Sequence, residues 1–346
     1  MHDIFPTANT IVCIEESKLL KQFRYDILYE TNGLEGALSE LNDINYFHSY
    51  KNADRFNYGN MLDDLMESVF DLLEEIAPSP IVWKLFALYY DIHNMKLVVK
   101  ERFFARRLDS MALRYGSYSL RTIRSAAVRQ EDNILGNELL TAGFFEALHC
   151  KDIYEIEFIL DRTYFKVLRY YAEQLAVEEI VEFVKVRVDL YNISAYFQGI
   201  ASGDAKSYLD LTFSDQGNYL REEWKKLWQE YEHLWIVKED EKDSWKRSRY
   251  NLDSNRSIRG VKSEQKSTNQ DIISLDDFVT IDVIFDNYLI HLSKRGKLEA
   301  FGYMPICAYF FNKLIEIKNI RILLTGKERG SKIEDIKMRM RIPYEI

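Results

Sequence analysis

The sequence predicts an all-α protein, and two observations lead to this fold class. The chain of 346 residues has only five prolines and 14 glycines, and no proline lies between residues 81 and 304. Apolar residues recur at helical spacing through nearly the whole chain. Because proline and glycine are the residues that most often end helices, this pattern predicts long helices packed on one another. The length suggests two or three domains, and a hydrophobic fraction of 47% is enough for a large core.

The N-terminal third predicts helices separated by clear turn signals. Thr7 is a candidate N-cap for a first helix that carries Ile11, Ile14 and the pair Leu19–Leu20. Asn32-Gly33 marks a turn, residues 46–60 are expected to be a loop, and Pro78-Ser79-Pro80 interrupts the chain. The other helices expected here are a short one around 34–41, Met61–Ile76 and Ile81–Leu108.

The remaining two thirds continue the helical pattern, with one polar interruption. Helices are expected around 119–130, 136–148, 152–175, 178–200, 204–211, 217–235, 275–292, 305–325 and 332–340, the third and the fourth forming an antiparallel pair. Gly326 is expected to end the helix that Pro305 begins. Residues 237–271 contain sixteen charged and only six hydrophobic residues among 35, which predicts an exposed, mobile insertion.

A short motif recurs on three of the predicted helices. An acidic residue is followed three positions later by asparagine, as in Asp91 and Asn94, Asp189 and Asn192, and Glu316 and Asn319. In each copy apolar residues occupy positions +1, +4, +7 and +8, so they form one stripe with the acid and the amide beside it. The pattern favours a structural hydrogen-bonding pair on a core helix, and a ligand site made of three acids is the alternative.

A second motif precedes two of these copies. Residues 156–161 and 281–286 share matched apolar positions and an acid-x-x-x-acid spacing. Recurrence of more than one motif predicts tandem repeats. The expected units are 1–115, 116–203 and 204–346, the third containing the insertion. Three such units can pack around an approximate threefold axis, where the surface suits a rod or a ring.

Composition argues against several functional classes. A net charge of −9 disfavours nucleic acid as the main partner. Cys13, Cys150 and Cys307 lack metal-ligand spacing and are expected to be buried free thiols. The N-terminus lacks the features of a signal peptide, and no apolar run approaches 18 residues. The six histidines show no i,i+4 pair, and neither a phosphate-binding loop nor GxSxG is present.

Two segments allow a functional interpretation as well as a purely structural one. Asp63-Asp64-Leu65-Met66-Glu67 has the form of a diphosphate-binding metal motif, but the facing cluster that this chemistry needs is missing, because Asp276-Asp277 lacks the spacing. We therefore expect a solvated acidic helix face. The helix at 217–235, rich in Trp and Tyr, is expected to pack in the core, with an interfacial membrane helix as the alternative. No catalytic, cofactor-binding or metal-ligating residue is expected.

The stretch from Glu316 to Lys327 closely resembles the C-terminal signature of the C subunit of bacterial and archaeal V/A-type rotary ATPases, whose eukaryotic counterpart is the d subunit. Further motifs that resemble this family lie, in the same order, at 8–20, 90–96, 160–165 and 189–193. The departures are the insertion at 237–271 and Thr10, which stands where an arginine often follows the family's Ala-Asn.

The resemblance implies a funnel-shaped, all-helical protein of three similar subdomains. Such proteins sit on the membrane rotor ring of c- or K-type proteolipids and receive the central stalk. The resemblance thus implies a non-catalytic coupler for H⁺ or Na⁺ transport that lies peripherally on the cytoplasmic side of the membrane. It implies no cofactor and no small-molecule substrate. A generic all-helical adaptor is the alternative. Whether the ion is H⁺ or Na⁺ is decided in the ring, so this sequence specifies neither the ion nor whether the complex makes or hydrolyses ATP.

Overall fold

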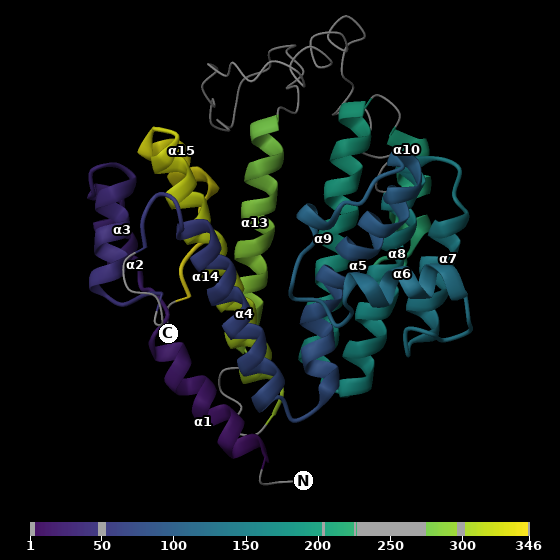
Figure 1. Ribbon diagram of the computed structural model, residues 1–346, viewed down its shortest axis with the longest axis horizontal. Helices are drawn as coiled ribbons and strands as arrows, with labels where there is room; N and C mark the ends of the chain where they lie inside the picture. The colour runs from purple at the N-terminus through teal and green to yellow at the C-terminus, as the bar shows by residue number, and fades with distance from the viewer. Residues whose placement is uncertain are drawn as a thin grey trace, which may run out of the picture. The chain divides into compact units, whose positions relative to one another are not determined.

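The fold is all-α, as predicted (Figure 1). The structure, a computed structural model, describes residues 4–47, 53–202, 205–224, 226, 275–295 and 302–344, and no strand occurs among them. The chain divides into two compact units. One contains Met1–Lys185 with Val283–Ile346, and the other contains Val186–Asp282. The predicted insertion at 237–271 lies outside the described residues.

Most helices lie where the sequence pattern predicts them. In order they are α1 Ile4–Ser17, α2 Gln22–Glu30, α3 Gly33–Asp43, α4 Tyr58–Ile76, α5 Pro80–Phe104, the 3-10 turn η1 Asp109–Met111, α6 Leu120–Arg129, α7 Glu138–His149, α8 Ile153–Leu175, α9 Glu178–Ser202, α10 Ala205–Thr212, α13 Leu275–Ser293, α14 Met304–Glu328 and α15 Ile333–Arg339. The helix α2 and the turn η1 were not expected. Phe23 and Ile27 of α2 are exposed, which weakens its amphipathic pattern.

Side-chain caps begin several helices of the first unit. Ser79 accepts the N–H of Ile81 at the start of α5, where Pro80 occupies the first turn. Ser119, Asn137 and Asp152 cap α6, α7 and α8 in the same way. These caps explain why the starts of these helices could be read from the sequence.

The end of α14 corrects one prediction. Gly326, expected to end this helix, lies inside it, and the residue with positive φ is Gly330 at +66°. The N–H of Gly330 donates to the carbonyl of Lys327, and that of Ser331 to the carbonyl of Gly326, which is a Schellman motif. A Cβ on Gly326 would lie 2.6 Å from Cγ1 of Ile336, so this glycine serves close packing of α15 instead.

Helix α14 organises the N-terminal part of the first unit. It packs against α1, α3 and α4, and α4 runs beside it in Figure 1. Its Lys327 donates to the carbonyls of Tyr29 and Thr31, at 3.3 and 2.7 Å, where α2 ends. A lysine placed there satisfies carbonyls that have no partner within their own helix. Residues almost 300 positions apart are thereby fixed together.

Helices α5, α7 and α8 pack on one another in the same unit. An aromatic cluster lies where α4 meets α5, with Tyr115 stacked on Phe70 at 5.7 Å and Tyr90 edge-on to both. The hydroxyl of Tyr115 donates to the carbonyl of Asp63 at 3.0 Å. The chain after α5 is thus held against α4.

The second unit has a smaller described core. Leu209, Phe213 and Trp224 are buried together, and Ile193 of α9 packs against them. Burial of Trp224 agrees with core packing for the start of the predicted 217–235 helix, although Tyr219 and Leu220 beside it are exposed. The rest of that predicted helix, apart from Lys226, lies outside the described residues.

The cysteines are free, as predicted, but only one of them is buried. Cys13 is exposed on α1 and Cys150 is half-buried after α7, so the expectation of buried thiols was wrong for both. An apolar neighbour in sequence lies on a different face of a helix, which is why local hydropathy misplaced Cys13. Burial raises the pKa of the Cys307 thiol to about 12.

Candidate functional site

The three asparagines of the recurring motif make the same pair of hydrogen bonds. Each side-chain amide donates to the carbonyl of one later residue and accepts the N–H of that same residue. Asn94 binds Leu113 at 2.8 and 3.0 Å. Asn192 binds Ser214 at 2.8 and 3.0 Å, and Asn319 binds Arg341 at 3.0 and 2.9 Å. We call this arrangement the asparagine clamp.

The clamp explains why the motif needs asparagine. A primary amide is a side chain that presents a donor and an acceptor side by side, so it can satisfy both polar groups of one peptide residue. Asn94, Asn192 and Asn319 are at most 2% exposed, so each amide needs partners within the protein. Of the clamped residues, Ser214 and Arg341 are buried and Leu113 is half-buried. Each clamp therefore fixes a chain segment that has left its helix against the core face of that helix.

The acids of the first two motifs hold the same segments a little further along. Asp91 accepts the N–H of Tyr118 at 3.1 Å, and Asp189 accepts the N–H of Asn218 at 3.0 Å. Each carboxylate leaves no room beside it for a side chain. A Cβ added to Gly116 would lie 2.4 Å from Oδ1 of Asp91, and one added to Gly217 would lie 2.1 Å from Oδ1 of Asp189.

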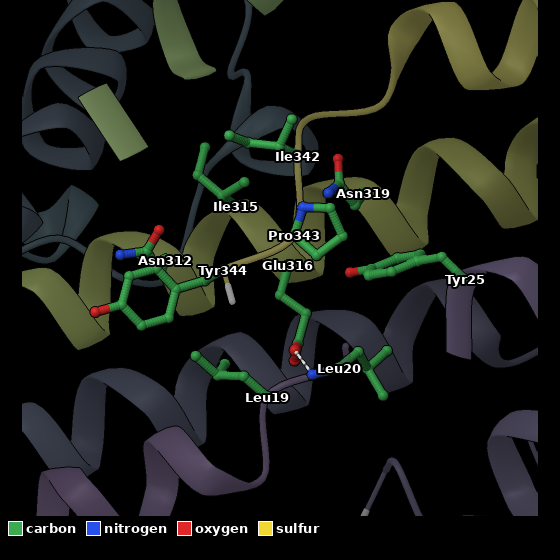
Figure 2. A pocket seen from close by; sticks show the side chains of 10 residues that line it. All are labelled: Leu19, Leu20, Tyr25, Asn312, Ile315, Glu316, Asn319, Ile342, Pro343 and Tyr344. Carbon is green, nitrogen blue, oxygen red and sulfur yellow. Dashed lines mark hydrogen bonds between the residues drawn. The ribbon is translucent and has the colours of Figure 1, made fainter. Parts of the chain in front are cut away.

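The acid of the third motif binds a different part of the chain (Figure 2). Oε2 of Glu316 accepts the N–H of Leu20 at 2.5 Å. Its Oε1 accepts a hydrogen bond from Nζ of Lys313 at 2.6 Å. The side chains of Lys313 and Glu316 are only 7% and 5% exposed, so this is a buried ion pair. The ammonium group of Lys313 also lies 5.2 Å from the ring centroid of Tyr46.

All three acids hold the backbone just before another helix begins. Tyr118 immediately precedes Ser119, the N-cap of α6. Leu20 immediately precedes Lys21, the N-cap of α2. Asn218 comes shortly before the helical residues 221–224. Glu316 thus holds the N-terminal segment in the same way that Asp91 and Asp189 hold the segments that follow their own helices.

Residues from both ends of the chain line a small cavity around Glu316 (Figure 2). Leu19, Leu20 and Tyr25 face Asn312, Ile315, Glu316, Asn319, Ile342, Pro343 and Tyr344. Burial first, and the charge of Glu316 next, raise the pKa of both Tyr25 and Tyr46 well above 10. These phenols stay neutral at physiological pH and can act only as hydrogen-bonding groups.

Asp91 also has a shifted pKa. Burial raises the pKa of its carboxyl group to about 7, while the N–H groups of Tyr118 and Ser117 act in the opposite direction. The carboxyl group therefore titrates near neutral pH, although it serves a structural hydrogen bond. A shifted pKa often marks catalysis, but it also arises in structural networks.

The acid-x-x-x-acid motif at 156–161 and 281–286 does not make the same contacts in its two copies. Asp161 on α8 pairs with Lys96 of α5 at 2.6 Å. Asp286 on α13 pairs instead with Lys318 of α14 at 2.9 Å and with Arg341 at 2.7 Å. The two acids share a sequence pattern but bind cations from different places. The asparagine clamp recurs more consistently on the three motif helices, although Asn42 of α3 makes the same pair of bonds with Ala53 outside these motifs.

The other candidate sites are occupied by internal partners. Arg321 binds Asp63 at 2.6 Å, and Arg114 lies 3.9 Å from Asp64, so arginines pair with two acids of this face of α4, which stays partly exposed. His93 and His149 lie within hydrogen-bonding distance of backbone carbonyls. Within the described part of the chain, no group of three His, Cys, Asp or Glu residues could hold a metal ion. In the same part, no helix is long and apolar enough to cross a membrane.

Sequence reasoning found the six motif residues but not what they bind. The clamp partners act through backbone atoms, so their side chains give no signal. A usable signal did exist, because a glycine follows each aspartate at similar distance, namely Gly116 after Asp91 and Gly217 after Asp189. Lys313 was overlooked as the partner of Glu316, although it precedes it by one helical turn.

The fold and the clamps define an all-helical protein whose motif acids and amides serve structure. The chain belongs to the ATP synthase (C/AC39) subunit family, whose model matches residues 8–339.

Curated relatives agree with this family. The chain is 24% identical over 345 residues to the C subunit of the V-type sodium ATPase of Enterococcus hirae, covering 98% of each chain. It is 23% identical over 371 residues to the C subunit of the A-type ATP synthase of Methanocaldococcus jannaschii, covering 97% of this chain and 86% of the relative. The corresponding A-type ATP synthase protein of Thermococcus kodakarensis is 23% identical over 207 residues, 56% of this chain and 57% of the relative.

Proposed function

We propose that this protein is the non-catalytic rotor component that couples the central stalk of a V/A-type rotary ATPase to its membrane rotor ring. It would act on the cytoplasmic side and transmit torque for H⁺ or Na⁺ transport. Two groups of findings support this proposal: the family match over residues 8–339, and relatives that are named as C subunits of such ATPases and ATP synthases. The observation that carries it is the family match over residues 8–339, and the three motif clamps add firmly held connections.

The clamp suits a part that bears mechanical load. Torque is lost as elastic strain if the transmitting body deforms, so its helices and connections have to be held stiffly. Each clamp fixes a connection to a helix with two hydrogen bonds from a buried asparagine, and close-packed interiors deform little. The ion pair between Lys313 and Glu316 adds a charged bond at the third clamp.

We further propose that the clamps mark three copies of one helical unit. Because Tyr118 and Asn218 are held at the entry to new helices, we place the unit boundaries after these two residues. They would replace the boundaries first expected at 115 and 203. The three helices α5, α9 and α14 would then be equivalent, and an approximate threefold funnel follows as the arrangement to test.

Co-purification tests the assignment directly. A tagged full-length chain, expressed at its native level, is expected to recover the stalk and ring proteins of a rotary ATPase from detergent-solubilised membranes. Density for the chain between shaft and ring in images of that complex would place it. Recovery of no rotary ATPase component, in repeated preparations, would favour a helical adaptor of another kind.

A transport measurement separates coupling from assembly. Membranes lacking the chain should lose ATP-driven ion uptake, and the intact chain should restore it. A chain with Asn319→Asp is expected to assemble but to transport fewer ions per ATP hydrolysed, because the loosened clamp yields under load. Asp63→Asn, which changes only a half-exposed pair, serves as the matched control. Normal uptake in membranes without the chain would contradict the proposal.

A further inference from the structure

The segment from Lys100 to Arg129 has the opposite charge to the whole chain. It contains eight basic and only two acidic residues, a net charge of +6 in a protein of net charge −9. It covers the end of α5, the turn η1 and all of α6. Charge concentrated in this way is a property of a surface that meets a partner of the other sign.

Four of these eight basic residues have acidic partners. Lys100 pairs with Glu157 and Arg114 lies near Asp64, both outside the segment, and the other two pair within it. Glu101 is shared by Arg107 at 3.1 Å and Arg124, and Asp109 is also bound by Arg124. Arg102 and Arg106 are exposed, and they form no ion pair with any residue that the structure describes. The two internal carboxylates are therefore already engaged, and at least two arginines remain available.

Large apolar side chains are exposed beside these arginines. Phe103, Phe104 and Met111 are 39%, 50% and 57% exposed, and the guanidinium group of Arg106 lies 6.0 Å from the Phe104 ring centroid. Met111 lies close to α5, because its carbonyl lies 3.1 Å from Nε2 of His93. We call this group the α5-end patch; it consists of Arg102, Phe103, Phe104, Arg106, Arg107 and Met111.

A purely structural role accounts for only part of this patch. Basic side chains in the last turn of a helix interact favourably with the helix dipole, which would explain Arg102. That interaction gives no reason to expose two phenylalanines and a methionine. Burying these side chains against a partner would gain free energy, because exposed apolar area is removed from water.

We propose that the α5-end patch is a docking surface for an acidic protein, which it binds through carboxylates on the arginines and through apolar contact with the phenylalanines. Arginine, phenylalanine and methionine are the residues enriched in protein interfaces, and arginine binds carboxylates with two parallel hydrogen bonds. A lipid surface favours lysine, tryptophan and tyrosine lying along a helix face, and the patch has none of these three residues. The proposal holds for an acidic partner of any function and does not rest on the rotor assignment.

A zero-length cross-link provides the direct test. Arg106→Lys keeps the charge and supplies an amine that carbodiimide can couple to a carboxylate in contact with it. In complexes purified through the full-length chain, mass spectrometry is expected to identify a bond between position 106 and an Asp or Glu of a second protein. The matched control is Arg329→Lys, an exposed position at the end of another long helix, which should give no such bond.

Charge reversal measures the contribution of the patch to binding. Arg102→Glu with Arg106→Glu is expected to weaken association with the cross-linked partner by about tenfold or more, and to reduce its dependence on salt. The control pair Arg329→Glu with Lys332→Glu makes the same change in net charge elsewhere and should leave the affinity within about twofold. Circular dichroism of both double variants verifies that they are folded.

Three results would overturn the proposal. One is a bond from position 106 only to residues of this same chain. Another is equal weakening by both double variants, which would show a non-specific charge effect. The third is binding of the chain to vesicles of phosphatidylcholine with 30% phosphatidylserine that only the patch variant loses, which would assign the surface to lipid. A cross-linked acidic partner outside any rotary ATPase would support this proposal while counting against the proposed function.

Discussion

The connections after α5 and α9 differ from the one at α14 in how the same bonds are made. After α5 and α9, one continuous segment supplies both the residue that the asparagine clamps and the N–H that the acid accepts. At α14, Arg341 supplies the first and Leu20 the second, from opposite ends of the chain. The asparagine and the acid thus make the same kinds of bonds at α14, although their partners there do not belong to one continuous segment.

The choice of acid and of neighbouring residue follows from this difference. Aspartate is short, so the continuous segment has to approach it closely, and only glycine fits at 116 and 217. Glutamate is longer by one methylene group and reaches across to Leu20, so the third segment need not approach it closely. Tyr344 therefore occupies the position that glycine takes in the other two segments. A buried lysine then becomes possible beside the longer acid. Five sets of variants test how far the equivalence between these connections extends.

Glu316→Gln should have the largest effect. The amide can still accept the N–H of Leu20, but Lys313 loses its anionic partner in a site where both side chains are nearly inaccessible. We expect a loss of about 3–5 kcal/mol in the free energy of unfolding, measured by urea denaturation. The double variant Glu316→Gln with Lys313→Met should recover part of this loss. An effect below about 1 kcal/mol would mean that the pair is not buried in solution.

Asp91 should make the stability of the first connection depend on pH. Its folded-state pKa is raised to about 7 by burial, above its ordinary value, so the folded state holds the proton more tightly. The contribution of Asp91 to the free energy of unfolding is fully present below about pH 4. Above that pH it falls by up to about 1.4 kcal/mol per pH unit until about pH 7. Asp91→Asn should remove this part of the profile. If the free energy of unfolding depends on pH in the same way in the intact protein and in Asp91→Asn, the raised pKa of Asp91 is contradicted.

The three clamps should respond alike to loss of the amide donor. Asn94→Asp, Asn192→Asp and Asn319→Asp each place a buried carboxylate against a backbone carbonyl, and we expect each to cost about 2–3 kcal/mol at pH 7. The cost should shrink at low pH, where a protonated carboxyl group can donate again. Hydrogen exchange at residues 113, 214 and 341 would locate the loss. A cost confined to one site would break the equivalence.

Alanine at the two close-packed glycines tests the continuous connections alone. Gly116→Ala and Gly217→Ala should each cost about 1–3 kcal/mol, because the new methyl group overlaps the aspartate carboxylate. Gly59→Ala is the matched control, since nothing lies within 4 Å of its Cβ position in α4, and it should be neutral or slightly stabilising. Thermal unfolding of the three proteins side by side is sufficient to rank them.

The smallest effect is expected at the surface pair of α4 and α14. Asp63→Asn removes a bond between side chains that are 45% and 43% exposed, so stability should change by less than about 1 kcal/mol. Added Mg²⁺ should not shift the unfolding temperature of the intact chain. A shift that Asp63→Asn abolished would revive the metal hypothesis for this face.

Local patterns predicted most of the fold but little of what the motif residues bind. The bounds of α8 and α13 agree with the predicted helices to within a residue, because long amphipathic stripes and caps are local signals. The end of α14 was misplaced because Gly326 looks like a helix stop, while its real neighbour is Ile336 on another helix. The contact of Glu316 with Leu20 joins distant positions through a backbone atom, so no pattern in the sequence could reveal it.

The bond between Glu316 and Leu20 also sets an order of events during synthesis. Its partners are 296 residues apart, and a ribosome adds roughly 5–20 residues per second. The N-terminal helices would therefore wait roughly 15–60 s for the helix that completes them. During that interval the exposed faces of α1 and α3 are open to wrong partners, so this region is where assistance by a chaperone would matter most.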